Sequence, residues 1–261
     1  MRIPSLGQPV FAATMIAIGI LGLVKVDFTT LWESVPKGFP ARQGLFYLCA
    51  LVCLACGGGL FWQRTASAAA RLLFVYMFLW MLAFKVRLII LYPLVEGAYQ
   101  TWGENAVEVA GAWVLYADLA GEWDRQHVGF ATGDRGVRLA RMLYGLALIG
   151  FGFSHFAYLN LTAPLVPVWL GIPVGWAYFT GSAYLAAALG ILTRVWARLA
   201  ATLSALQMAG FTFLVWIPIM LSGHMKPSQW TEFVVSWTLT AAAWVVADSY
   251  RGQPWLAVGK R

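Results

Sequence analysis

Apolar residues dominate long stretches of the chain, and charged residues, Pro or Gly separate one stretch from the next. Each stretch is about 20 residues long, enough for an α-helix to cross the hydrocarbon core of a bilayer. The stretches cover residues 10–28, 43–61, 72–94, 99–118, 142–158, 173–191, 199–221 and 231–247. We therefore expect an all-α integral membrane protein with about eight transmembrane helices. The gap at 119–141 is the one long enough to hold a folded domain, and its many charged residues predict a solvated loop.

The basic residues predict the orientation of these helices. If the helices alternate in direction, most of the 18 Lys and Arg fall on the side that holds both termini and the loops at 62–71, 119–141 and 192–198. Cytoplasmic loops of membrane proteins carry an excess of Lys and Arg. The sequence therefore predicts a multi-pass protein of a bacterial-type inner membrane with both termini in the cytoplasm.

The two halves of the chain resemble each other. The segment GAWVLYAD that ends at Asp118 is similar to AAWVVAD ending at Asp248, and Ala-Arg-Leu at 70–72 recurs at 197–199. Four helices return the chain to its starting side, so two such copies share one orientation. We expect a first four-helix repeat at 1–121, a cytoplasmic loop at 122–138, a second four-helix repeat at 139–250 and a cytoplasmic tail at 251–261, with each repeat forming one bundle.

Composition narrows the classes of function. Of 261 residues, 61% are hydrophobic and only 11% are charged, with a net charge of +7 and a mean hydropathy of +0.71. Soluble domains carry about 25% charged residues. This composition excludes a soluble enzyme, a nucleic-acid-binding module and a disulfide scaffold. The bilayer itself is the first expected partner.

Ionisable residues inside the predicted helices are the candidates for chemistry, because a charge in the membrane is costly unless it is paired or faces water. Lys85, Glu104 and His155 each lie 14 positions from a basic or acidic residue expected at the cytoplasmic boundary, so we expect them at a similar depth. Glu104 and Glu108 share one helix face. The predicted polar cluster, a site for a ligand head group or for protons, contains Asp27, Lys85, Arg87, Glu104 and Glu108. Two alternative interpretations are a structural network of ion pairs and, if the third and fourth helices are shorter, side chains that extend out to the membrane surface.

His155 and Tyr184 form the expected counterpart of this cluster in the second half. A single histidine in a helix is more often a packing residue than a ligand, and neither HxxxH nor ExxH occurs, so no metal site is predicted. Cys49, Cys53 and Cys56 share one face of the second helix, next to three glycines. Thiols in that pattern can bind Cu(I), but close helix packing is the simpler interpretation.

A series of landmarks in the second half resembles the DoxX-like family of membrane proteins. The landmarks are His155-Phe156, Val166-Pro167-Val-Trp169-Leu170-Gly-Ile-Pro173, Trp176 with Thr180-Gly181, Leu189-Gly190 and Ala197-Arg198-Leu199. The resemblance implies a four-helix membrane bundle, in some members linked to quinone-dependent redox systems such as thiosulfate:quinone oxidoreductase. Many relatives carry a Glu shortly after the Thr-Gly pair, where this chain has Tyr184.

From these features we expect a subunit of a membrane redox system that binds a quinone or another small hydrophobic ligand, together with other membrane subunits. No signature of a covalent cofactor is present, so whether the chain is itself an enzyme stays open. Two alternatives also remain open: a transporter of a small solute or ion that uses the buried charges, and a structural or assembly subunit without a ligand.

Overall fold

The computed structural model describes residues 6–25, 35–36 and 38–259, and every described segment of regular structure is helical apart from one isolated bridge. The long helices of the first half are α1 (Gly7–Lys25), α2 (Arg42–Leu60), α3 (Gln63–Trp80) and α5 (Glu96–Leu119). Those of the second half are α7 (Gly133–Ala157), α9 (Pro173–Thr193), α10 (Ala197–Gly210) and α12 (Pro227–Ser249). These segments lie where the sequence predicts its eight apolar runs.

Two of the long helices continue through a π-helical turn. α3 passes through η2 (Met81–Val86) into α4 (Arg87–Leu91), and α10 passes through η5 (Phe211–Trp216) into α11 (Ile217–Leu221). π-helical segments are rare and are found mainly at functional sites or where an extra residue enters a helix. Both segments are six residues long and both lie in the third long helix of their half.

Membrane embedding follows from helix length and apolar composition. Within the described ranges, six helices are long and apolar enough to cross a membrane. They are Gly7–Val24, Arg42–Leu60, Gln63–Leu91, Gly133–Ala157, Pro173–Thr193 and Ala197–Leu221. The protein is thus a polytopic helical membrane protein. α5 and α12 are equally long but less apolar, and both contribute many buried residues.

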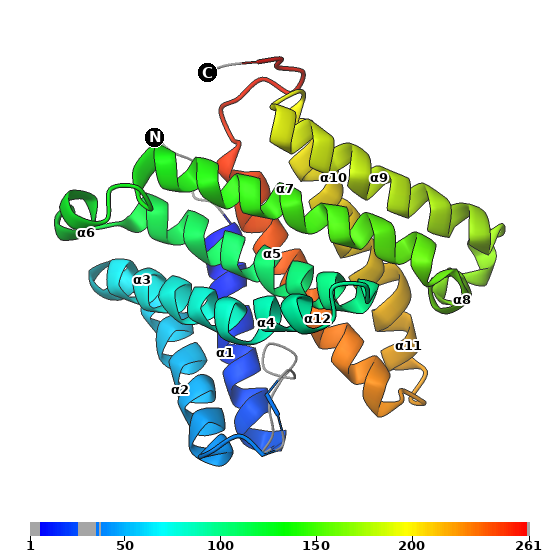
Figure 1. The fold of residues 1–261 in the computed structure, drawn as a ribbon, viewed down its shortest axis with the longest axis horizontal. Helices are drawn as coiled ribbons and strands as arrows, with labels where there is room; N and C mark the ends of the chain where they lie inside the picture. Colours follow the sequence, from blue (N-terminus) through cyan, green and yellow to red (C-terminus); the bar gives the residue numbers. More distant parts are fainter. Residues whose placement is uncertain (1–5, 26–34, 37, 260–261) are drawn as a thin grey trace.

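α5 and α12 occupy the centre of the molecule. α5 packs against α3, α7 and α12, whereas α12 packs against α1, α5 and α10. Figure 1 shows α5 and α7 side by side across the middle of the molecule, with α1 and α2 on one side and α9 and α10 on the other. Several polar residues of α5 and α12 face other helices and are buried, among them Asn105 and Glu108 of α5 and Ser236 and Thr238 of α12.

Glycines let the central helices approach closely. A Cβ atom on Gly111 of α5 would lie 3.0 Å from the Cα of Ala242 on α12, and one on Gly103 would lie 3.2 Å from the carbonyl oxygen of Ala147 on α7. Small residues at such contacts bring helix backbones together, which is the main source of packing energy in a bilayer. α5 is thereby fixed against two neighbours.

The helix starts differ most from the predicted boundaries where charged residues precede an apolar run. α3 begins at Gln63 rather than 72, and α7 begins at Gly133 rather than 142. Residues 119–141 therefore do not form one long loop, since they contain the short helix α6 (Glu122–His127) and the first two turns of α7. Short helical turns, α8 (Leu159–Thr162), η3 (Ala163–Leu165) and η4 (Val168–Leu170), connect α7 to α9.

α6 is held against the ends of α3 and α5 by polar contacts. Arg71 pairs with Asp124 at 3.1 Å, and the hydroxyl of Tyr116 donates to the same carboxylate oxygen at 3.0 Å. The Arg71 guanidinium also lies 5.5 Å from the ring centroid of Trp123. The charged segment after α5 is therefore attached to the helix bundle.

Candidate functional site

A group of buried polar residues lies between η2 and α5. Lys85 is 2% exposed, Asn105 is 2% exposed and Glu108 is 3% exposed. The side-chain amide of Asn105 donates to Oε2 of Glu108 at 3.2 Å. Lys85 attracts Glu108 electrostatically and Glu104 repels it. We call Lys85, Glu104, Asn105 and Glu108 the charged cluster.

The π-helical turn explains how a lysine reaches this position. η2 packs against α5, and Lys85 lies in its last turn. A π turn contains more residues per turn than an α-helix, so it changes which side chains face a neighbouring helix. Because a charged group buried among helices is costly unless it is compensated, the nearby carboxyl group of Glu108 on α5 contributes to stabilising Lys85 here.

The structure brings together only part of the predicted cluster. Glu104 is half-buried, and its Oε1 accepts a hydrogen bond from the amide of Gln100 at 3.3 Å. Arg87 is exposed, because two residues along a helix turn a side chain to roughly the opposite face from Lys85. Asp27 lies outside the described residues.

His155 and Tyr184 lie close together in a mainly aromatic environment. Their ring centroids are 5.5 Å apart, and the ring of Phe211 in η5 lies 5.6 Å from that of His155. Nδ1 of His155 lies 2.8 Å from the carbonyl oxygen of Phe151, one turn earlier in the same helix. Tyr184 is buried. These contacts connect α7, α9 and η5.

A groove with a volume of about 880 Å³ lies between the first turns of α5 and the last turns of α7. We call it the α5–α7 groove. Most of its lining is apolar, and the lining residues include Pro93, Leu94, Tyr99, Trp102, Ile149, Phe153, Phe156 and Ala157. Leu94 is 97% exposed and Phe153 is 55% exposed. The groove is therefore open to the surroundings of the helices rather than enclosed.

One carboxylate lines this apolar groove. Glu96, in the first turn of α5, accepts a hydrogen bond from the hydroxyl of Ser154 on α7 through Oε1. Its other oxygen, Oε2, is buried and has no hydrogen-bond partner among the residues that the structure describes. An unpaired buried acceptor costs free energy, so a donor group bound in the groove would be stabilised there. The sequence did not indicate Glu96 as a site residue, because it lies between two predicted helices.

The cysteines pack as the simpler interpretation predicts. Cys49, Cys53 and Cys56 are all buried. A Cβ atom on Gly57 would lie 2.8 Å from the carbonyl oxygen of Ala12, so α1 and α2 touch backbone to backbone at this face. In the part of the chain that the structure covers, no three His, Cys, Asp or Glu side chains gather in a way that could hold a metal ion.

Comparisons with protein-family models, curated proteins and solved structures gave no match to this chain. The resemblance to the DoxX-like family therefore rests on the sequence landmarks alone. What the structure supports directly is a polytopic helical membrane protein with a buried charged cluster and an apolar groove.

Proposed function

We propose that the protein binds a small lipophilic ligand with a polar head group in the α5–α7 groove, and that this ligand is a quinone exchanged with a membrane redox system. The observation that carries the proposal is an apolar cavity of about 880 Å³ with one carboxylate in its wall. Ligand sites of this size are mostly apolar with a few polar groups that orient the ligand. The DoxX-like landmarks point to the same ligand class.

The proposal includes the predicted topology of two four-helix repeats in one orientation, with eight crossings and cytoplasmic termini. Two structural parallels support a duplication. Each half carries a six-residue π turn in its third long helix. In each half an arginine of that helix also lies over the ring of a tryptophan that follows the fourth helix, Arg71 over Trp123 and Arg198 over Trp255. In this topology the groove lies toward the outer face.

The test is to fill the groove and measure quinone. Ala157 is exposed and lines the groove, so Ala157→Trp fills it without disturbing a buried contact. Leu161→Trp, also exposed and outside the groove lining, is the matched control. We expect quinone in protein purified in mild detergent, measured by mass spectrometry of the extract, to fall at least tenfold in Ala157→Trp only. Wild-type protein that neither retains nor rebinds a benzoquinone would overturn the proposal.

A second candidate function is transport of a small solute or ion, and the charged cluster favours it. Ionisable residues inside a membrane bundle mark ion and proton pathways in many transporters. Flux measured in proteoliposomes should then be lost in Lys85→Met and in Glu108→Gln. Flux that survives both substitutions would count against this function without affecting quinone binding in the groove.

A further inference from the structure

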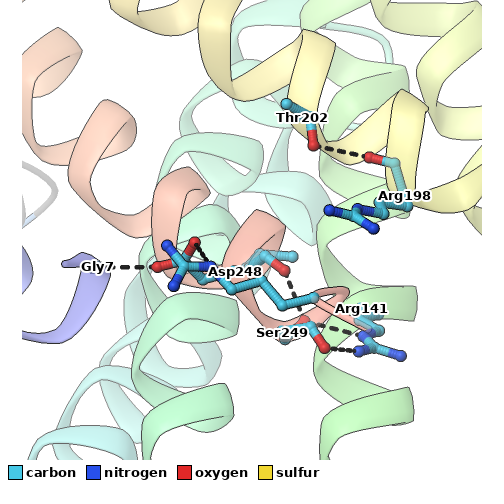
Figure 2. Close-up of polar contacts among 8 residues, drawn as sticks. Gly7, Arg141, Arg198, Thr202, Asp248 and Ser249 are labelled. Atoms are coloured by element: carbon cyan, nitrogen blue, oxygen red, sulfur yellow. Dashed lines mark hydrogen bonds and ion pairs between the residues drawn. The ribbon is translucent and has the colours of Figure 1, made fainter. Parts of the chain in front are cut away.

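A second cavity lies at the other end of the molecule, between α10 and α12, with a volume of about 280 Å³. Its lining divides into a polar end and an apolar part. The polar end contains Arg198, Thr202, Asp248 and Arg251. Figure 2 shows Arg198 and Thr202 on α10 and Asp248 near the end of α12. The apolar part includes Ala205, Leu206, Ala209, Phe213 and Trp244.

Arg198 is held in a fixed position at this cavity. Its Nη1 donates to the carbonyl oxygen of Gln253 at 2.7 Å, and its guanidinium lies 3.9 Å from the ring centroid of Trp255. The segment that supplies these contacts is itself attached to the turn before α10, because the backbone amide of Trp196 donates to the carbonyl oxygen of Ala257 at 2.8 Å. A guanidinium positioned in this way binds an anion at a small entropic cost.

The corresponding arginine of the first half shows what is missing here. Arg71 stacks on Trp123 but also pairs with the carboxylate of Asp124. Arg198 has only neutral partners, and no ion pair between it and a carboxylate occurs in the described residues. Asp248 lines the same cavity but pairs with Arg251 at 2.8 Å. The polar end therefore carries one positive charge in excess.

The apolar part of the cavity determines the kind of anion. Leu206 is 61% exposed and Phe213 is 51% exposed, and both belong to a helix long and apolar enough to cross the membrane. An anion that places its charge at Arg198 and an acyl chain along these side chains uses both parts of the cavity. A soluble anion uses only the polar end.

We propose that this cavity binds an anionic phospholipid, with the phosphate at Arg198 and Arg251 and an acyl chain along Leu206, Phe213 and Trp244. Basic pockets between transmembrane helices bind anionic head groups on the cytoplasmic side, where the positive-inside pattern places this end of the molecule. The site is separate from the α5–α7 groove and does not depend on the function proposed for it.

The experiment compares lipid binding to the purified full chain in detergent by native mass spectrometry, with phosphatidylglycerol and phosphatidylcholine as probes. We expect the double variant Arg198→Gln/Arg251→Gln to bind phosphatidylglycerol at least tenfold more weakly than wild type. Arg138→Gln, which removes an exposed positive charge from the first turns of α7, is the control and should change binding less than twofold. Binding of phosphatidylcholine should not change in either variant.

A second variant is expected to bind phosphatidylglycerol more tightly, which a misfolded protein would not do. Asp248→Asn removes the negative charge beside the cavity and keeps an oxygen that can accept from the backbone amide of Gly7, so phosphatidylglycerol should bind more tightly. Equal binding by the double variant and the Arg138→Gln control would overturn the proposal. Inorganic phosphate that displaces phosphatidylglycerol at millimolar concentration would show a site for free anions and would overturn it as well.

Discussion

The two π-helical turns share a backbone geometry but place different chemistry against the neighbouring helix. η2 turns Lys85 toward the carboxylates of α5. η5 turns Thr212 toward α12, where its hydroxyl lies 2.8 Å from that of Ser236 and 2.9 Å from that of Thr240. Thr212 is fully buried. The comparison shows that the π turn presents a polar side chain to the fourth helix, and the residue at that place decides whether the contact is charged or neutral.

The difference matters because the two kinds of contact depend differently on their partners. Hydroxyl groups in a helix bundle also bond to carbonyl oxygens of their own helix, so each can stay satisfied when a neighbour is lost. A buried ionised group needs a compensating charge or water. A single substitution in the charged cluster should therefore lower the free energy of unfolding strongly. Loss of the Thr212 hydroxyl in η5 should lower it only slightly.

The largest expected effect follows from Glu108→Leu. The substitution removes the carboxyl group that accepts from Asn105 and that attracts Lys85, and leaving a buried polar group unsatisfied costs about 1–3 kcal/mol. The free energy of unfolding, measured in mixed detergent micelles with SDS as denaturant, should fall by about that amount.

Two further variants separate charge from hydrogen bonding at this position. Glu108→Gln keeps an acceptor for Asn105 and should show how much of the loss is due to charge. Lys85→Met combined with Glu108→Leu removes both charges and should recover more than half of the loss. If the Glu108→Leu protein is as stable as wild type, the charged cluster is no more sensitive to substitution than the Thr212 hydroxyl, and the contrast between the two π turns is lost.

A smaller effect is expected at the other π turn. Thr212→Val removes the hydroxyl between Ser236 and Thr240, but Thr240 keeps its bond to the carbonyl oxygen of Ser236 at 2.8 Å. Hydrogen bonds between membrane helices contribute about 0.6 kcal/mol on average, so the loss should be about 1 kcal/mol at most. Thr212→Ser restores the hydroxyl and should return to wild-type stability in the same assay. A loss as large as that of Glu108→Leu would remove the contrast between the two turns.

The smallest expected effect is a loss of stability at high pH. It comes from Tyr250, which lies outside both π turns. Burial raises the pKa of Tyr250, just after α12, from 10.0 to about 12. Above pH 10 the unfolded chain loses this proton and the folded chain keeps it, so stability is complete below pH 10 and falls as the pH rises toward 12. At pH 10.5 the loss should be under about 1 kcal/mol, because one pKa unit corresponds to about 1.4 kcal/mol.

Tyr250→Phe tests this assignment. Phenylalanine keeps a ring beside the Arg141 guanidinium, which lies 3.8 Å from the ring centroid of Tyr250, but it cannot ionise. Stability between pH 9 and pH 10.5 should then decline less in the variant than in the wild type. An identical decline in both proteins would assign the pH dependence to another group.

Hydropathy predicted where the helices lie but not where several of them begin. The predicted 173–191 and 199–221 agree closely with α9 and with the helix at Ala197–Leu221. α7, by contrast, starts at Gly133 because its first turns carry Asp134, Arg135 and Arg138, which an apolar pattern does not include. Helical hydrogen bonding continues into the polar region, whereas the hydropathy signal marks only the apolar part.

The candidate site was predictable only in part, for a related reason. The i and i+4 spacing placed Glu104 and Glu108 on one face of α5, and the matching depth of Lys85 indicated that it faces them. The π turn itself has no clear sequence signal, and Arg87 was grouped with Lys85 although half a turn separates them. Glu96 was missed because its environment is created by Ser154, 58 positions later in the chain.

The glycine contacts of α5 determine how a ligand can enter the groove. Gly103 sets α5 against α7, and Gly111 sets it against α12, both at backbone distance. Helices joined in this way have little freedom to slide or roll, so the two walls of the groove are parts of one rigid body. Because the groove is open, the ligand proposed for it would enter without separation of the helices, and exposed side chains such as Leu94 and Phe153 rotate on the nanosecond timescale. Exchange of a ligand with the bilayer should accordingly be limited by lateral diffusion in the membrane.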